Sequence, residues 1–134
     1  MSAPAVAVLG DGKKVAAAWM DERTKKGERR VYWRLSDSQR LGKEAPVDDA
    51  STSQQDHPAL AFDASGTAWV AWEEGRKSEQ RIRFRSSADG SRPAQASDDS
   101  QGKAAFPSIA AGGGLVGVTY ESGSGVSCRI LRGE

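Results

Sequence analysis

The sequence has little of what several classes of protein need. It holds one cysteine, Cys128, in 134 residues, which excludes an internal disulfide framework and a zinc cluster built on cysteines. Its longest apolar run, residues 15–20, is far shorter than the roughly 20 residues that cross a bilayer. Its first four residues are not a charged segment leading into an apolar one, so no signal peptide is predicted.

An excess of one charge is missing as well. The chain has 19 Lys and Arg against 18 Asp and Glu, a net charge of +1. No overall field therefore draws it to nucleic acid or to an anionic membrane, and neither partner is expected. Hydrophobic residues make up 37% of a chain that also has 15 glycines. This composition is typical of a globular protein, and the length suits a single domain over residues 1–134.

A repeat is the strongest positive signal. A Pro-x-apolar-Ala motif occurs at residues 4–7, 58–61 and 107–110, so its copies start about fifty residues apart. Each copy leads through a Gly- or Asp-containing turn into an apolar run that ends in an aromatic residue and an acid. These aromatic residues are Trp19, Trp72 and Tyr120. After a polar hairpin, an alternating strand carries an arginine at one register position, as Arg34, Arg85 and Arg129.

The constant order of these landmarks predicts three homologous units, at 4–49, 58–99 and 107–134. Short β-rich runs bounded by Gly, Asp, Ser and Pro indicate four antiparallel strands in each complete unit and three in the last. The second strand is apolar at consecutive positions, so both of its faces should be covered. The predicted fold is all-β: four-stranded antiparallel blades of a β-propeller, about two and three-quarter blades in this chain.

A partial propeller leaves apolar blade faces and sheet edges uncovered, which promotes association. The sequence therefore predicts either self-association, in which two copies make a ring of about six blades, or remaining blades elsewhere. The recurring arginines are expected to form ion pairs or hydrogen bonds between blades rather than to bind a ligand.

The same landmarks resemble the bacterial sialidase-like propellers built from BNR, or Asp-box, repeats. In that family a blade reads Pro-x-apolar-Ala, a Gly turn, a strand ending Ala-Trp-acid, and a strand ending Arg-x-Ser before an Asp-Gly turn. The second unit fits this pattern at 58–61, 66, 71–76 and 85–90. The Asp box itself is degenerate at 87–93, where Ser91 replaces its glycine and no tryptophan follows. The resemblance implies a secreted or periplasmic protein with a sialidase-like propeller.

The resemblance also implies a catalytic pattern, which this chain lacks in part. Sialidases of this fold clamp a substrate carboxylate with three arginines, the first of which lies two positions before the proline of an Arg-Ile-Pro start. Those positions hold Ser2, Asp56 and Ala105, so this part of the bidentate clamp is missing. Tyr120 and Glu121 are neighbours in a predicted strand and should point to opposite faces, which prevents them from acting as the family's nucleophile–base pair.

Other candidates favour structural roles. Acid pairs recur at strand ends, at 21–22, 48–49, 73–74 and 98–99. Such recurrence suits solvated or turn-capping side chains better than a two-carboxylate glycosidase site, with Ca²⁺ binding as an open alternative. His57 has no second histidine or suitable cysteine beside it and is interpreted as a loop residue. Cys128 holds the place of Trp33 and Phe84 in the repeat and is predicted to be buried. No catalytic residue, metal site or cofactor is assigned.

The hairpins after the second strands are basic in both complete units. Their eight cations are Arg23, Lys25, Lys26, Arg29, Arg30, Arg76, Lys77 and Arg81. Because chain direction alternates, these hairpins should share a propeller face with the connections 50–57 and 100–106. Aromatic residues that could stack on bases are lacking there, which disfavours single-stranded nucleic acid. The cluster predicts a binding surface for an anionic glycan or an acidic protein surface.

Three functions remain open on these grounds. The residues favour a non-catalytic propeller module for binding or scaffolding. The resemblance keeps a sialidase-like glycoside hydrolase as the alternative, with its site completed by remaining blades or by a partner chain. A pure assembly element is the third possibility.

Overall fold

The computed structural model describes residues 2–123 and 125–133, with the backbone alone for Lys77, Arg132 and Gly133. Within them, eleven strands form three antiparallel sheets. The first sheet holds β1 (Ala5–Val8), β2 (Lys14–Asp21), β3 (Arg30–Asp37) and β4 (Glu44–Pro46). The second holds β5 (Gln55–Phe62), β6 (Ala68–Glu74), β7 (Arg81–Ser86) and β8 (Ala94–Gln95). The third holds β9 (Ala104–Gly112), β10 (Leu115–Ser122) and β11 (Gly125–Gly133).

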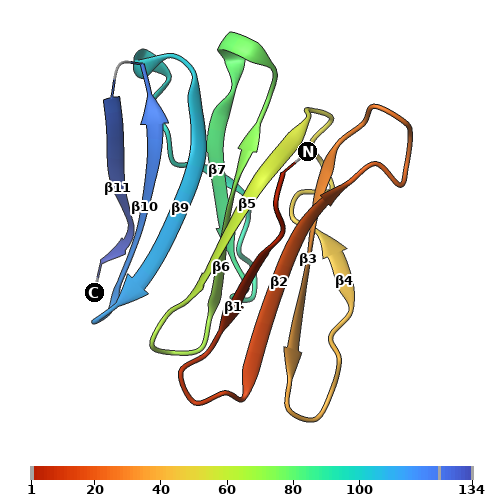
Figure 1. Ribbon diagram of the computed structural model, residues 1–134. Coiled ribbons are helices and arrows are strands. Elements are labelled where there is room, and N and C mark those ends of the chain that lie inside the picture. The colour runs from red at the N-terminus through yellow and green to blue at the C-terminus, as the bar shows by residue number, and fades with distance from the viewer. Residues whose placement is uncertain (1, 124, 134) are drawn as a thin grey trace.

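Each sheet follows chain order, as β1-β2-β3-β4, β5-β6-β7-β8 and β9-β10-β11. The sheets stack face to face, and their first strands, β1, β5 and β9, lie side by side (Figure 1). This is the arrangement of propeller blades around an axis. The all-β class, the partial propeller and the strand pattern of four, four and three are therefore confirmed.

Short 3₁₀ turns occur at η1 (Lys77–Glu79) and η2 (Asp99–Gln101). Among the described residues, no helix has the length and apolar character needed to cross a membrane.

Alternating side chains form a core on each side of the second blade. Ala18 and Trp33 of the first blade pack with Trp72 of β6, and Ile82 packs on the other side with Val118 of β10. Every residue of β6 is buried. The run of consecutive apolar residues thus marks a central strand covered on both faces, as predicted.

The outer faces of the first and third blades have no neighbour among the described residues. Val6 on β1 is 70% exposed and Val126 on β11 is 75% exposed. Cys128, two positions from Val126 and so on the same face of the strand, is exposed too. The prediction that Cys128 is buried is wrong, because Trp33 and Phe84 are covered by a following blade and no described blade follows the third.

The recurring arginines connect successive blades. Arg85 Nη1 donates a hydrogen bond to the carbonyl of Val47, 2.8 Å away, and Arg129 Nη1 donates to the carbonyl of Ala96 at 3.1 Å. Val47 and Ala96 each follow the fourth strand of their sheet, so the contact is repeated. The expected bonds between blades are confirmed for these two. Within the described residues the guanidinium of Arg34 makes no hydrogen bond, and its Nε is buried.

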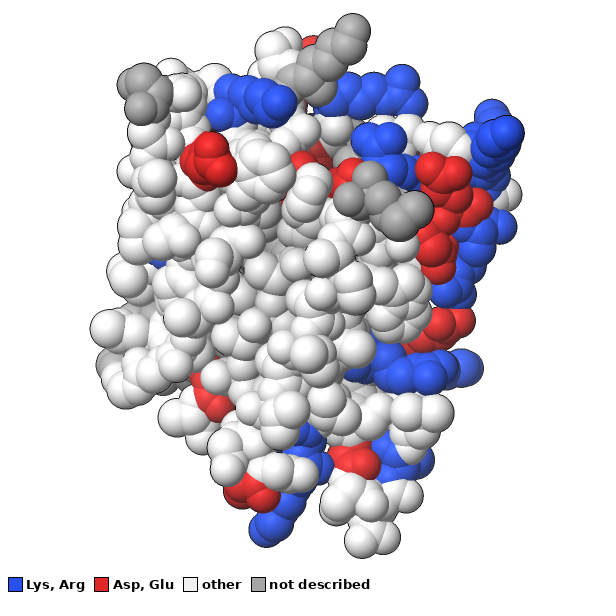
Figure 2. Space-filling model, in the orientation of Figure 1, with Lys and Arg blue, Asp and Glu red and all other residues white. Residues whose placement is uncertain are grey.

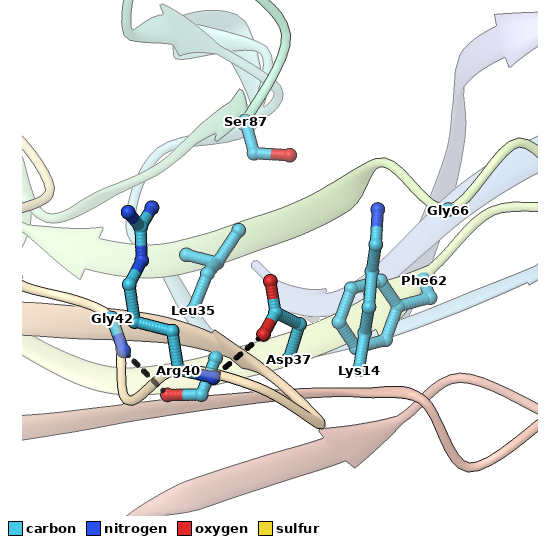
Figure 3. A pocket seen from close by; sticks show the side chains of 9 residues that line it. Lys14, Leu35, Asp37, Arg40, Gly42, Phe62, Gly66 and Ser87 are labelled. Atoms are coloured by element: carbon cyan, nitrogen blue, oxygen red, sulfur yellow. Dashed lines mark hydrogen bonds between the residues drawn. The ribbon is translucent and has the colours of Figure 1, made fainter.

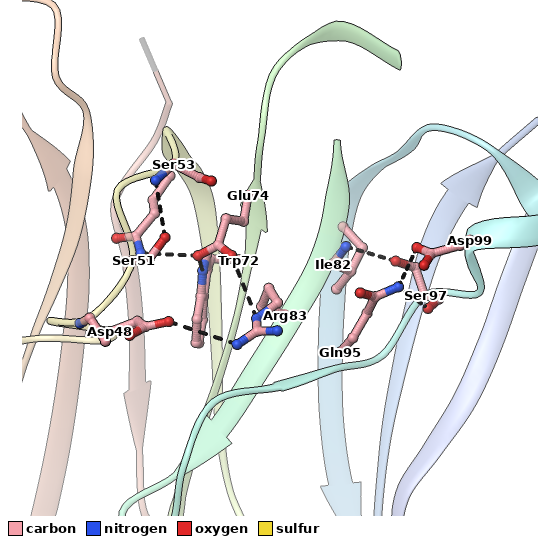
Figure 4. Close-up of polar contacts among 12 residues, drawn as sticks. Asp48, Ser51, Ser53, Trp72, Glu74, Ile82, Arg83, Gln95, Ser97 and Asp99 are labelled. Carbon is pink, nitrogen blue, oxygen red and sulfur yellow. Dashed lines mark hydrogen bonds and ion pairs between the residues drawn. The ribbon is translucent and has the colours of Figure 1, made fainter. Parts of the chain in front are cut away.

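A second polar contact joins the first two blades. Arg83 lies between Asp48 and Glu74 (Figure 4), with its guanidinium nitrogens 3.8 and 3.6 Å from their carboxylate oxygens. The indole Nε1 of Trp72 also donates to Glu74, at 3.3 Å. A buried carboxylate needs such partners because it has lost its water.

One aspartate organises the turn between β5 and β6. Oδ1 of Asp63 accepts from the backbone N–H groups of Ser65 at 2.9 Å and Thr67 at 3.0 Å, and Oδ2 accepts from the indole of Trp69 at 2.9 Å. Gly66 completes the turn at φ 83, where a side chain would be strained. Burial alone would raise the pKa of Asp63, but the hydrogen bonds outweigh it and hold that pKa below its usual value.

Candidate functional site

The basic hairpins line a cavity at one end of the blades. It encloses about 460 Å³ and is lined by Lys25, Lys26, Gly27, Glu28, Arg30, Thr52, Gln54 and Arg76. Lysine and arginine side chains are visible at the upper end of the molecule in Figure 2, and others lie along its right side and at its lower end. Because Thr52 and Gln54 belong to the connection between the first two blades, the structure places that connection beside both hairpins, as the alternating chain direction predicts.

Two buried glutamines hold the cavity wall. The Gln54 amide donates to the carbonyl of Gly27 at 2.7 Å and accepts from the N–H of Arg29 at 2.6 Å. The Gln55 amide accepts from the N–H of Val31 at 3.0 Å. Gln54 directly precedes β5 of the second blade and Gln55 begins it. Both form hydrogen bonds to the β2–β3 hairpin of the first blade or to the start of β3, so the cavity spans two blades. Sequence reasoning missed them because two uncharged glutamines at the start of a strand form no known motif.

Positive charge in the cavity is only partly compensated. Arg30 is held by Glu28 at 2.8 Å and by the carbonyl of Ser53 at 2.6 Å. Three other cations at the cavity are exposed and form no ion pair with a described residue: Lys25, Lys26 and Arg76. An anionic group is the ligand that such a site favours.

Arg23, one of the predicted binding residues, forms ion pairs within the first blade and does not line the cavity. Its guanidinium contacts Asp21 and Glu44, each at 2.6 Å, and lies 4.1 Å from the ring centre of Tyr32. The hydrogen bond from Arg23 holds the pKa of the Glu44 carboxyl below its usual value. This arginine is therefore a structural group of the first blade.

Two further predicted cations, Arg29 and Arg81, also lie outside the cavity. Arg29 pairs with Asp56 at 3.1 Å. Arg81 lines a separate hollow with Asp99 and Gly102, beside the connection to the third blade. The side chain of Lys77 lies outside the described part of the structure.

The acid pairs differ from unit to unit. Asp98 caps η2 by accepting from the N–H of Ser100 at 2.9 Å, as a turn-capping role predicts. Glu73 and Glu74 are each only 4% exposed, so the interpretation as solvated or turn-capping acids is wrong for this pair. In the part of the chain that the structure describes, no three His, Cys, Asp or Glu side chains are grouped so as to hold a metal ion.

A histidine and a phenylalanine meet over one of these buried acids. His57 lies within β5 and not in a loop, so that prediction is wrong. Its Nδ1 is 2.9 Å from Oε1 of Glu73, and Oε2 of the same carboxylate accepts from the N–H of Phe106 at 2.7 Å. The two rings meet edge to face with centroids 5.0 Å apart. The sequence signal for this pair is the proline that directly follows each residue, Pro58 after His57 and Pro107 after Phe106, which gives both the same place in the repeat.

A second pocket lies between the first two blades at their opposite end. It encloses about 200 Å³, with Leu35 and Phe62 among its lining residues. Lys14 and Arg40 flank the carboxylate of Asp37 (Figure 3). That carboxylate is already engaged by the N–H groups of Gln39 and Arg40, both at 2.8 Å. The pocket is therefore built around a turn whose aspartate faces both of its cations, whereas the three exposed cations of the basic cavity pair with no carboxylate of a described residue.

The comparisons with known proteins bear on the fold. No family model and no curated relative matches the sequence. Among solved structures, the chain is similar to an α-L-arabinanase from Penicillium chrysogenum complexed with arabinobiose, with a TM-score of 0.59 and 13% identity. The match covers 92% of this chain and 40% of that propeller chain. At this identity the likeness establishes the β-propeller fold and nothing finer.

Proposed function

We propose that the chain is part of a β-propeller that binds an anionic carbohydrate at the basic cavity, without catalysis. The observation that carries the proposal is the set of three unpaired cations, Lys25, Lys26 and Arg76, around one cavity shared by two blades. Similarity to a propeller solved with a sugar in place supports a carbohydrate over an acidic protein as the ligand. Polar lining groups such as Thr52 and Gln54 suit the hydroxyl groups of a sugar.

The Lys25→Ala/Lys26→Ala variant is expected to bind a short oligogalacturonate about tenfold more weakly than the unmodified chain. Each exposed charge contact contributes up to about 1 kcal/mol, and about 1.4 kcal/mol is a factor of ten. Isothermal titration calorimetry at low and high salt measures the loss, and salt should weaken binding by the unmodified chain. Lys43→Ala removes an exposed lysine outside the cavity and should change nothing. Equal affinities for all three proteins would contradict the proposal.

A sialidase-like glycoside hydrolase, with its site completed by remaining blades or a partner chain, is the alternative function. The arabinanase similarity favours an enzyme of this general kind. Against it, Ser2, Asp56 and Ala105 stand at the arginine positions, and buried Tyr120 and exposed Glu121 point to opposite faces of β10. Turnover of a fluorogenic sialoside or arabinoside, lost on changing Asp21 or Glu121, would favour the hydrolase over the binding module.

We propose further that the two free blade faces are covered by self-association or by remaining blades. Val6 and Val126 are exposed on those faces, and Arg34 lacks the carbonyl that Arg85 and Arg129 find in a preceding blade. Joining copies head to tail would continue the apolar packing that the blade faces already make with each other.

Light scattering over a range of concentrations is expected to show a mass rising toward twice that of one chain. Val126→Asp should return the protein to a monomer, because a buried unpaired charge is costly. Leu41→Asp places the same charge at another exposed apolar position and should leave the assembly intact. A monomer at every concentration would reject self-association and leave remaining blades as the cover.

A further inference from the structure

Two residues hold the same strained conformation at the same place in neighbouring blades. His57 has φ 47 and Phe106 has φ 54, and among the described residues other than glycine these are the positive values. Each residue directly precedes a proline near the start of the first strand of its blade. The pairing of each strand shifts register at this point. In β5 the shift lies between Asp56 and Ala59, and in the β9–β10 pair it lies between Thr119 and Glu121 of β10, opposite Phe106. Bulges of this kind re-aim side chains and are frequent beside functional sites.

Burial of the two side chains does not offset the cost of their backbone conformation. Such a backbone conformation costs about 1–3 kcal/mol per residue. Phe106 is nevertheless 55% exposed, and the side chain of His57 is 35% exposed. Phe106 is one of eight large apolar side chains that the described part of the protein leaves exposed, and it lies near the start of its strand, at the end of the blades that carries the basic hairpins.

Glu73 fixes both residues from beneath. Its carboxylate is buried, and each of its oxygens is used: one by the imidazole of His57, the other by the backbone of Phe106. Because an ionised carboxylate only accepts, Nδ1 of His57 must carry a proton to bond Glu73, and a neutral imidazole would then present Nε2 as an acceptor. No described residue bonds that Nε2. The carboxylate of Asp56 lies 4.0 Å from Nδ1 and pairs with Arg29 on the hairpin of the basic cavity.

We propose that Phe106 and His57 form a sugar-binding subsite next to the basic cavity, with Glu73 as its positioning residue. The flat Phe106 ring offers a surface to the C–H face of a sugar ring, while Nε2 of His57 accepts from a hydroxyl group. The subsite takes an uncharged sugar unit, since Arg29 and Asp56 beside it neutralise each other. Arg29 bonds Gln54 of the cavity wall through its N–H and pairs with Asp56 beside His57, so the subsite adjoins the cavity and one oligosaccharide can contact both. This inference rests on the proposed function and names a second contact for the same ligand.

The subsite is tested with the whole chain labelled with fluorinated phenylalanine. The chain has three phenylalanines, so Phe62 and Phe84 serve as internal controls for Phe106. A neutral arabino-oligosaccharide should shift the fluorine signal of Phe106 and leave the other two in place. Phe106→Leu, which keeps an apolar side chain but loses the flat ring, should weaken binding about tenfold. Phe106→Tyr should retain binding, whereas His57→Ala, which removes the hydroxyl acceptor and the ring that packs on Phe106, should weaken it.

The outcomes separate this inference from the proposed function. If Lys25→Ala/Lys26→Ala weakens oligogalacturonate binding while neither sugar shifts Phe106, the subsite is rejected and the basic cavity stands. If Phe106 shifts and Phe106→Leu weakens binding while the lysine variant has no effect, the subsite stands alone. An unmodified chain that binds neither sugar rejects both. Glu73→Gln should keep the fold, because its amide oxygen can still accept from Phe106, but should weaken neutral-sugar binding as His57 loses its carboxylate partner.

Discussion

Replacing Trp72 with alanine is expected to lower the free energy of unfolding by about 3–5 kcal/mol. Trp72 is fully buried on β6, where it packs against the first blade in the larger core cluster. Removing the ring loses its burial from water and leaves a cavity that the rigid neighbouring sheets cannot fill. Urea unfolding followed by circular dichroism measures the change, since the remaining tryptophans complicate fluorescence.

Trp19→Ala is the matched control for this variant. Trp19 holds the same place in the first blade, and its indole donates to the acid two positions on at 3.2 Å, as that of Trp72 does at 3.3 Å. It stacks on Tyr32 but has no second blade over it. Its loss should therefore cost about 1 kcal/mol. Equal losses for the two variants would mean that blade packing does not stabilise the fold as the structure indicates.

Asp63→Ala is expected to cost about 2–4 kcal/mol, because it leaves the indole of Trp69 and two backbone N–H groups without their acceptor. Asp11 lies in the corresponding turn of the first blade, but it is exposed, and among the described residues its carboxylate accepts only from the N–H of Lys13, at 2.9 Å. Asp11→Ala should therefore stay within about 0.5 kcal/mol of the unmodified chain. Thermal and urea unfolding at neutral pH compare the two variants.

Asp63 also makes stability depend on pH. Its pKa in the folded state lies below the ordinary value of 3.8. Above the unfolded-state pKa of about 4 the carboxylate is ionised in both states and its stabilisation is complete. As pH falls below that, the unfolded chain takes up the proton first, so stability is lost through the folded pKa. The unmodified chain should lose more stability below about pH 4 than Asp63→Ala, and parallel curves would contradict this role.

The fold could be predicted because the information for it is local and repeated. The consecutive apolar residues around Trp72 indicate a strand covered on both sides, and three copies of one pattern indicate stacked sheets. The recurrence of an arginine at one register position also predicts a contact between blades, and Arg85 and Arg129 both donate to carbonyls of the preceding blade. Because every residue has a backbone carbonyl, this contact depends on the position of the arginine in the blade and not on the identity of the acceptor residue.

The errors in prediction arise where a residue's role depends on a neighbour that the sequence does not place. The equivalence of Cys128 with Phe84 in the repeat predicts a core position, but the exposure of Cys128 depends on whether another blade follows. His57 looked isolated because its partner, Glu73, is sixteen residues away along the chain. The basic hairpins were found from their charge, whereas the pairing of Arg23 with Glu44 and of Arg29 with Asp56 could be seen only once the blades were stacked.

The bond from Arg85 to Val47 and its copy from Arg129 to Ala96 have a consequence for how such proteins evolve. Because the donor is a side chain at a fixed place and the acceptor is the main chain, a duplicated or deleted unit recreates the joint without compensating substitutions. Genes for such repeats can therefore lengthen or shorten by whole units, and the loops that carry specificity can diverge while the joints stay the same.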